Sequence, residues 1–394
     1  MKIVEVTTPK QGKTWVKMYY AFYKNDTNFI PHIESDIEKI FDPEKNKFFK
    51  HGRATRFLLY NDSGELIGRT AAFINDRTAS AYKQPTGGMG FFECIDSQEA
   101  ANLLFDTCKE WLKEHGMEAM DGPVNFGERD TFWGLLVENF TDPNIYSMNY
   151  NPPYYRALFE NYGFKLYFEQ YAVKRPMESA QQVYFDKSEE IRKDPNFRTT
   201  NIRGMSWDKV AQDFMTVYND AWGGHDGFKE MSLESAQKAM HKLKPLVDKD
   251  IVIFAYYNDR PIAFYVNIPE LNQTFKHLNG KLDLIGKLKF LYHKYRRTSR
   301  IMLGIVFGVA RDFQGRGVEA SLVIHGHYTI LPLKRYDTTI ICWIGDFNPK
   351  MLKLRDNLGF SNWRTWITYR YLFDRNAPYE RAPILGSEHK TDKE

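Results

Sequence analysis

The chain has 394 residues, of which 43% are hydrophobic and 26% charged, and its formal net charge is +4. This composition excludes a chain that is disordered throughout, and the length suits two or three domains of about 150 residues each. The balanced charge does not point to a nucleic-acid-binding protein, and three cysteines (Cys94, Cys108, Cys342) form no disulfide framework. No signal peptide is visible, and the most apolar stretch, at 301–310, is too short to cross a membrane. We therefore expect a cytoplasmic protein.

Periodicity and turn residues predict strands that alternate with helices, which indicates a mixed α/β sheet. In chain order we expect a hairpin at 57–68, a strand near 90–93, a helix from Asn151 to Gly163, a strand at 165–174, helices at 207–222 and 233–246, a strand at 251–257 that opens a second hairpin, a strand at 301–309, a helix at 321–330, a strand at 338–344, a helix from Asn348 to Gly359 and a strand at 363–373. Asn151 and Asn348, each followed by proline, are expected to be helix N-caps.

Two of these patterns recur at one interval. The hairpin turn at Asn61 recurs at Asn258, and the helix entry at Asn151 recurs at Asn348, both 197 residues later. The shared interval predicts two copies of one fold, although hairpins and glycine-terminated helices are also common by chance. The predicted division is a first domain at 1–177, a linker at 178–196, a second domain at 197–376 and a polar tail at 377–394.

The segment from Val309 to Leu322 carries the clearest chemical signal. Gly315 and Gly317 stand two residues apart between a predicted strand and a predicted helix. Glycine permits a tight turn with positive φ, and the free N–H groups of the helix start form an anion site suited to a pyrophosphate. Arg311 and Arg316, which lie beside the glycines, can add positive charge. Taken alone, the glycine pair also fits an ordinary turn, and neither a P-loop nor a dinucleotide-binding pattern is present.

The run Gln314-Gly315-Arg316-Gly317-Val318, with Val309 and Phe313 upstream and Leu322 downstream, resembles the acyl-CoA loop of the GNAT N-acetyltransferase superfamily. The strand at 340–343 and the helix after Asn348 fit the same family, and the resemblance covers 197–376. It implies an α/β (α+β) protein with two GNAT-like domains, each a mixed, mostly antiparallel sheet flanked by helices. Glu319 departs from the family, which has Gly or Ala there, and its carboxylate could repel a phosphate.

The resemblance also implies an activity and a set of ligands. We expect an N-acetyltransferase that moves an acetyl group from acetyl-CoA to an unidentified amine in the C-terminal domain, without a metal. Backbone N–H groups of the 305–309 strand would hold the oxyanion. The implied cofactor-binding residues are Phe307, Val309, Gln314, Gly315, Arg316, Gly317, Val318, Glu319 and Asn348.

The first copy lacks the glycine loop, since no glycine lies between Gly90 and Gly116. Asp96 and Glu99 instead predict a capping box, in which two carboxylates would occupy the helix start and oppose a phosphate. We therefore expect a degenerate first domain that does not bind coenzyme A.

The catalytic acid and base are less clear, because Arg355 stands where the family often has a tyrosine and the 301–309 strand has no glutamate. The candidates are Glu270, Asp346, Arg355 and Tyr369, with Tyr371 as a further acid. Each has a structural alternative: a solvated loop for Glu270, a helix cap for Asp346, a surface helix position for Arg355 and core packing for the tyrosines. His325 and His327 lie two apart on a helix, so they would not share a metal ion.

The segment 281–300 has seven Lys or Arg residues, one Asp and interleaved apolar residues. It fits a solvated helix with an apolar underside. It also fits an electropositive lid that lies near either the acyl-CoA phosphates or an acidic acceptor. A third interpretation is a helix that adsorbs to a membrane surface. Two other functions remain open from the sequence. One is an aminoacyl-tRNA-dependent aminoacyltransferase, for which this segment could contact tRNA. The other is a non-catalytic binding protein with the same fold.

Overall fold

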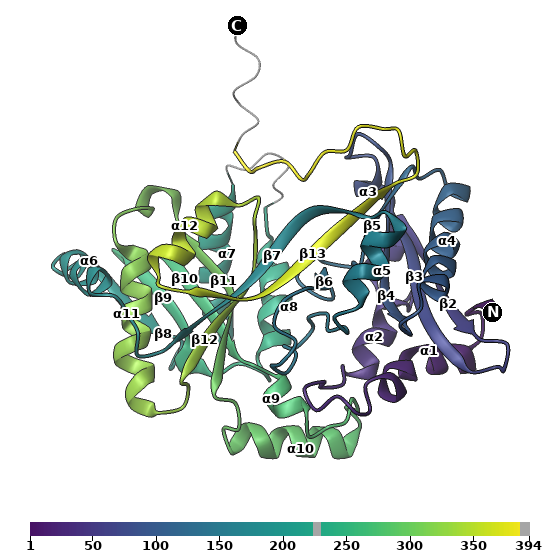
Figure 1. The fold of residues 1–394 in the computed structure, drawn as a ribbon. Coiled ribbons are helices and arrows are strands. Elements are labelled where there is room, and N and C mark those ends of the chain that lie inside the picture. The colour runs from purple at the N-terminus through teal and green to yellow at the C-terminus, as the bar shows by residue number, and fades with distance from the viewer. Residues whose placement is uncertain (224–229, 387–394) are drawn as a thin grey trace, which may run out of the picture.

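The computed structural model describes residues 1–223 and 230–386, which form one sheet of 13 strands flanked by helices (Figure 1). The elements of the first half are β1 (Lys2–Glu5), α1 (Pro9–Phe22), α2 (Glu34–Ile40), β2 (Gly52–Tyr60), β3 (Leu66–Asn75), α3 (Asp76–Ala79), β4 (Thr86–Cys94), α4 (Gln98–Glu114), β5 (Ala119–Gly122), β6 (Leu135–Leu136), α5 (Tyr155–Tyr162) and β7 (Lys165–Pro176).

The second half begins after a connecting helix, α6 (Gln182–Arg192). Its elements are β8 (Phe197–Asn201), α7 (Trp207–Trp222), α8 (Leu233–Leu243), β9 (Val252–Tyr257), β10 (Arg260–Pro269), α9 (Asn272–Phe275), α10 (Leu284–Tyr295), β11 (Ile301–Val309), α11 (Val318–Ile330), β12 (Thr338–Gly345), α12 (Pro349–Asn357) and β13 (Ser361–Leu372). Every strand and helix that the sequence predicts in this half is present. The predicted α/β class, with a mostly antiparallel sheet flanked by helices, is confirmed.

The two halves have the same strand order. The sheet runs β1-β2-β3-β4-β5-β13-β7-β12-β11-β10-β9-β8, and β6 pairs with β13 outside this path. In each half three antiparallel pairings are followed by one parallel pairing, β4 with β5 and β11 with β12. This agreement is what the 197-residue repeat predicts.

The last strand of each half lies in the sheet of the other half. β7, from the first half, pairs with β12, while β13, from the second half, pairs with β5. The two exchanged strands also pair with each other, and they run diagonally across the centre of the molecule in Figure 1. The domain limits drawn from the sequence stay a prediction, but neither half completes its sheet with its own last strand.

Apolar side chains on opposite faces of the second-half strands pack against different helices. Phe254 and Phe264 belong to the core under α7 and α8, whereas Ile253 and Tyr265 belong to the core under α11. This alternation follows from the two-residue period of a strand. It places α11, whose start carries the glycine loop, on the face opposite α7 and α8.

Three local predictions need correction. The linker at 178–196 contains α6, whose Tyr184 and Ser188 are buried, and the Ser321 hydroxyl donates to that of Ser188 at 3.3 Å. Asn151 does not cap α5, because its side chain bonds both backbone groups of Leu136, at 2.8 and 3.0 Å. The cap of α4 is Ser97, which accepts from the Ala100 N–H at 3.3 Å, so the predicted capping box from Asp96 is wrong.

Asn348 does cap α12, as predicted, by accepting from the Met351 N–H at 3.2 Å. In the predicted tail, residues 387–394 lie outside the described residues. The described part is held by backbone hydrogen bonds, in which the Ala382 N–H donates to the Tyr167 carbonyl of β7 and the Leu385 N–H donates to the Phe347 carbonyl after β12.

Candidate active site

Strands β11 and β12 part along their length. Their parallel pairing covers Ile301–Gly304 with Thr338–Ile341. Beyond it, β12 pairs with β7 through Ile344 and Gly345, while β11 continues beside β10 to Val309. The register of β10 with β11 shifts so that Ile305 has no partner across the pair, which makes a β-bulge. The edge of β11 from Ile305 onward therefore faces a cleft instead of a neighbouring strand.

The glycine loop lies at the far end of this cleft. After β11, a short 3-10 turn (Arg311–Phe313) leads to Gly315 and Gly317, whose φ angles are +75° and +85°. Gly317 is the N-cap of α11, so the free N–H groups of the first helical turn face the loop. A side chain added at Gly315 would meet nothing within 4 Å, which leaves room for a ligand to approach the main chain.

A pocket of about 530 Å³ opens at this loop. Six of the nine predicted cofactor-binding residues line it: Phe307, Val309, Gln314, Gly315, Gly317 and Glu319. Its other walls were not predicted from the sequence; they come from α6 and α12 and include Tyr184, Lys187, Lys350, Lys353 and Asn357. Three lysines and a helix N-terminus around one pocket suit an anionic ligand such as a pyrophosphate.

The other three predicted residues do not line this pocket. Val318 is fully buried in the core under α11, Arg316 lies over the ring of Phe313, and the Asn348 side chain caps α12. Arg311 is also engaged elsewhere, because its guanidinium forms an ion pair with Asp220 on α7.

One polar contact occupies the loop itself. The Gly315 N–H donates to the Glu319 carboxylate at 3.3 Å. A negatively charged oxygen thus already sits where the loop can bind an anion. A phosphate on these N–H groups would have to displace it.

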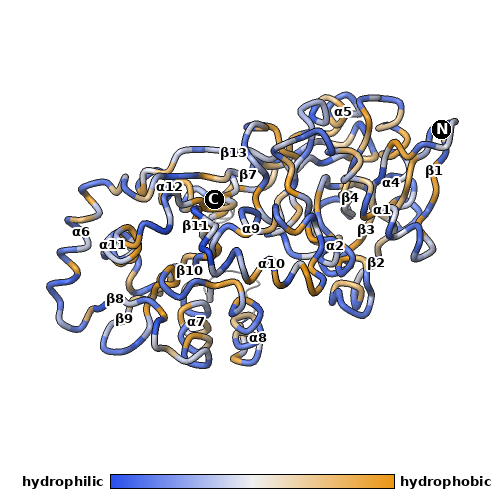
Figure 2. Tube along the Cα trace, turned by 90° about the horizontal axis from the view of Figure 1, so that it is seen from below, coloured by the Kyte–Doolittle hydropathy of each residue, from blue (hydrophilic) through white to orange (hydrophobic). Residues whose placement is uncertain are grey.

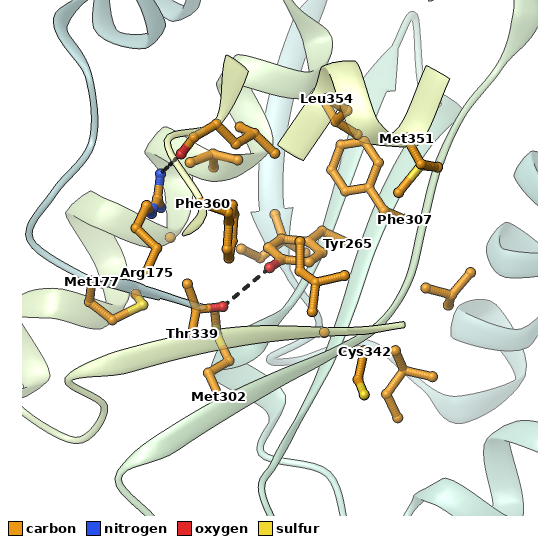
Figure 3. A pocket seen from close by; sticks show the side chains of 18 of the residues that line it. Arg175, Met177, Tyr265, Met302, Phe307, Thr339, Cys342, Met351, Leu354 and Phe360 are labelled. Carbon is orange, nitrogen blue, oxygen red and sulfur yellow. Dashed lines mark hydrogen bonds between the residues drawn. The ribbon is translucent and has the colours of Figure 1, made fainter. Parts of the chain in front are cut away.

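A second, apolar cavity of about 110 Å³ continues from the same cleft. It shares Phe307, Met351 and Leu354 with the loop pocket and extends to Met302 and Met177 (Figure 3). Two hydrogen bonds cross its walls, one between Tyr265 and Thr339 at 3.5 Å and one from Arg175 to the Leu358 carbonyl at 2.8 Å. Arg175 and Met177 come from β7 and the residue that follows it, so the exchanged strand completes this cavity.

Among the predicted catalytic residues, Glu270 is 4% exposed and accepts from the backbone N–H groups of Tyr146, Asn272 and Gln273 at 2.9–3.1 Å. Burial raises the pKa of Glu270, although these three hydrogen bonds lower it. The carboxylate therefore holds the start of α9 against the first half, and it does not lie in a solvated loop. It lines neither pocket of the cleft.

Asp346 and Arg355 lie near the cleft but are bound to neighbours. Asp346 is paired with Arg381, and burial raises the pKa of its carboxyl. Arg355 donates to Asp356 at 2.8 Å and to Asn362 at 2.9 Å. Neither side chain lines the two pockets described above.

Tyr369 lies in the other half of the molecule, because β13 is exchanged. Its ring packs against Phe159, and its hydroxyl donates to Glu160 at 2.8 Å. Burial raises the pKa of Tyr369 well above its ordinary value, so the hydroxyl stays protonated. Tyr371 contacts Tyr162 of α5 in the same half. The structure therefore does not bring these tyrosines to the glycine loop.

The corresponding cleft of the first half is largely filled and keeps a cavity of only about 30 Å³. β4 and β5 part after Gly88 and Asp121, but the Val124 N–H donates to the Met89 carbonyl at 2.8 Å. Further along, the Cys94 N–H donates to the Tyr155 hydroxyl at 2.8 Å. Val124 and Tyr155 thus bond the edge of β4, whereas the equivalent edge of β11 is open.

No metal site accompanies the cleft: across 1–223 and 230–386, no three His, Cys, Asp or Glu side chains are placed to hold an ion. In the same part of the chain, no helix has both the length and the apolarity needed to cross a membrane.

No protein-family profile matches the chain. It is 24% identical over 394 residues to the "Bacterial ceramide synthase" of Caulobacter vibrioides, with 94% of this chain and 97% of that protein covered. It is also 24% identical over 370 residues to "Protein YghO" of Escherichia coli, with 91% and 93% covered.

Two solved structures share the architecture. A tandem GNAT protein from the clavulanic acid biosynthesis pathway superposes with a TM-score of 0.52 at 9% identity, with 96% of this chain and 99% of that chain covered. A GCN5-related glucosamine N-acetyltransferase region in a fungal multi-domain β-N-acetylglucosaminidase gives 0.53 at 14% identity; the match covers 94% of this chain but 38% of that one. The strand order, the parting strands and these likenesses together show that the chain has the tandem GNAT fold.

Proposed function

We propose that the chain is an N-acyltransferase that takes its acyl group from a coenzyme A thioester bound between β11 and β12. The observation that carries this proposal is the continuity of the cleft. It has an anion-binding helix start at one end, a free strand edge in the middle and an apolar cavity beyond. The pyrophosphate, pantetheine arm and acyl chain of an acyl-CoA need these three environments in this order.

The residues at the loop fit the anionic part of such a ligand. Gly315 leaves open space over its backbone, and Lys187, Lys350 and Lys353 line the same pocket. The thioester, when bound, supplies an activated acyl group. Backbone N–H groups on the free edge of β11 near Ile305 are suited to hold the oxyanion that forms when an amine attacks.

We further propose that the acyl group is longer than acetyl. The cavity that extends from Phe307 to Met302 is lined mainly by apolar side chains, and an acetyl group would leave it empty. Each buried methylene of a longer chain contributes about 0.8 kcal/mol. The relative named a ceramide synthase supports this choice, because a ceramide is the amide of a fatty acid and a long-chain amino alcohol. We therefore propose a long-chain amino alcohol as the acceptor, and acetyl-CoA with a small amine as the competing possibility.

Calorimetry with coenzyme A, acetyl-CoA and palmitoyl-CoA, the last below its micelle concentration, tests the donor. We expect binding of all three and an affinity that rises with chain length. Release of free coenzyme A thiol in the presence of sphinganine, compared with a short-chain amine, tests the acceptor. Equal affinity for acetyl-CoA and palmitoyl-CoA would refute the long acyl chain, and no binding of coenzyme A would refute the whole proposal.

A further inference from the structure

Helix α10 presents an unusual outer surface. It lies at the lower face of the molecule in the connection from β10 to β11, and Figure 2 views this face directly. Fifteen large hydrophobic residues are exposed in the described part of the chain, and six of them belong to this one helix. The exposed fraction of these six residues is 58% to 89%: Leu284, Ile285, Leu288, Leu291, Tyr292 and Tyr295. Such a cluster marks an interaction surface, because single exposed apolar residues are normally scattered.

The six side chains form one stripe along the helix. At about 100° per residue they fall within an arc of roughly 120°. Lysines border the arc on both sides, with Lys287 on one flank and Lys289 on the other, followed by Arg296 just past the helix end. Lys294 lies on the same flank as Lys287, but its ammonium donates to the Pro245 carbonyl. An apolar stripe between two basic flanks is the pattern of a helix that lies in a membrane interface, where lysine side chains reach outward to the headgroups.

The opposite side of α10 is fixed to the protein, so the stripe cannot turn inward without breaking contacts. Phe290 packs against Phe275 at 5.8 Å between ring centroids, and the His293 ring stacks on His277 at 3.8 Å. Asp283 caps the helix by accepting from the Gly286 N–H at 2.8 Å. The anchored face and the exposed stripe thus belong to one rigidly oriented helix.

We propose that α10 docks the protein on the surface of an anionic lipid bilayer. The segment 281–300 has seven basic residues and one acidic residue, which complement a negatively charged surface. A second copy of the chain is a poorer occupant, because pairing two α10 stripes would bring their lysine flanks together. The helix has 12 residues, so it can lie on the bilayer but is too short to span it.

Vesicle co-sedimentation of the full chain tests this proposal. We expect binding to vesicles of phosphatidylcholine mixed with phosphatidylglycerol, much weaker binding to phosphatidylcholine alone, and weakening by salt. Leu288→Ser combined with Leu291→Ser should lower the partition coefficient by at least about tenfold, since two leucines lose their burial in the interface. Lys287→Gln combined with Lys289→Gln should lower it roughly tenfold on the anionic vesicles.

The matched control is Val183→Ser combined with Leu333→Ser, which removes two exposed apolar side chains elsewhere, at 44% and 43% exposure. This control should bind vesicles like the unaltered chain, and circular dichroism checks the fold of every variant. Equal loss in the control and the α10 variants would overturn the proposal. Absence of binding to both vesicle types would also overturn it. In that case, a dimer that the leucine substitutions dissociate in sedimentation velocity would identify a second copy of the chain as the occupant.

Discussion

The clefts of the two halves are built from the same strands but are finished differently. In the second half, β11 leaves an open edge, and the eight residues 310–317 shape a loop with two left-handed glycines before α11. In the first half, three residues (95–97) join β4 to α4, and tyrosine side chains bond the end of β4. The parted strands of one repeat thus leave an open cleft, while the other repeat occupies most of the same place with its own side chains.

The filled cleft contains a buried polar cluster. Glu93 accepts from the Tyr23 hydroxyl at 2.7 Å and from the Tyr155 hydroxyl at 2.9 Å, and it faces Arg69 at 3.5 Å. Burial raises the pKa of Glu93 above its ordinary value, while Arg69 and the two hydroxyls oppose this rise. The cluster shows that side chains on β4 and α5 are committed to stability in this half. The equivalent surfaces of β11 and α12 line pockets.

The largest expected effect tests the glycine loop. Gly315→Asp should weaken coenzyme A binding about a thousandfold, because two like charges about 4 Å apart at an effective dielectric near 20 repel by roughly 4 kcal/mol. Gly315→Asn is the matched control, since asparagine has the same shape and tolerates positive φ but lacks the charge. This position is better than Gly317, where a Cβ would lie 3.1 Å from the Lys187 carbonyl. Calorimetry measures both variants. Equal affinities would show that the loop does not meet a phosphate.

The next effect tests the apolar cavity. Gly326 lines it from α11, and a Cβ there would lie 3.4 Å from Ile330 and 3.6 Å from Ile253, which are ordinary contacts. Gly326→Leu should fill the cavity and exclude about four methylenes, which lowers the affinity for palmitoyl-CoA on the order of a hundredfold. Acetyl-CoA should bind as before.

Gly326→Ala serves as the control for the backbone change and should retain most palmitoyl-CoA affinity. If Gly326→Leu weakens acetyl-CoA and palmitoyl-CoA equally, the substitution has damaged the loop pocket. If palmitoyl-CoA binds unchanged, the acyl chain lies elsewhere.

A third prediction concerns the filled cleft. Tyr155→Phe removes the hydroxyl that bonds Cys94 and Glu93, which leaves a buried N–H unsatisfied and should cost about 1–3 kcal/mol of unfolding free energy. Urea denaturation measures this loss. Tyr328→Phe, at a side chain that is 55% exposed, should change stability little. Coenzyme A affinity should stay the same in both variants, and a loss of affinity in Tyr155→Phe would contradict the assignment of the site to the second half.

The same cluster has a pH signature. Because burial raises the pKa of Glu93 above its ordinary value of 4.5, the native state holds this proton more tightly than the unfolded state does. The contribution of Glu93 to stability should therefore fall as pH rises from the unfolded pKa through the folded pKa. Glu93→Gln should flatten the pH dependence of the urea midpoint in that range. An unchanged profile would show that Arg69 and the tyrosines fully offset the burial.

The parts of this site that depend on local signals could be predicted from the sequence. The glycines, the apolar strand before them and the helix after them lie within about twenty residues, and the loop pocket contains most of the residues predicted for it. α6 was missed because its buried side includes a serine, Ser188, beside Tyr184, which gives little apolar periodicity.

The exchange of β7 and β13 could not be predicted, because both strands are aromatic and follow similar helices. Their partners depend on packing between residues that lie about 160 to 250 positions apart in the sequence. That exchange is the physical reason why Tyr369 lies far from the loop.

The smallest expected effect has the opposite sign. The Glu319 carboxylate accepts from the Gly315 N–H at 3.3 Å and so competes with any phosphate for the loop. Glu319→Gln should raise coenzyme A affinity about three- to tenfold, because the competing charge is removed, and the gain should shrink in high salt. It should also cost α11 about 0.3–1 kcal/mol, since an acid in the first turn stabilises the helix dipole.

The control for this change lies in the other half. Glu99 occupies the first turn of α4, the helix that follows β4 as α11 follows β11. Glu99→Gln should cost a similar fraction of stability but leave coenzyme A affinity unchanged, because the first-half helix start faces a filled cleft. Calorimetry on both variants at low and high salt separates the two effects. If Glu319→Gln lowers the affinity, the carboxylate helps to hold the ligand and does not compete with it. If both variants raise the affinity equally, the gain comes from net charge and not from the loop.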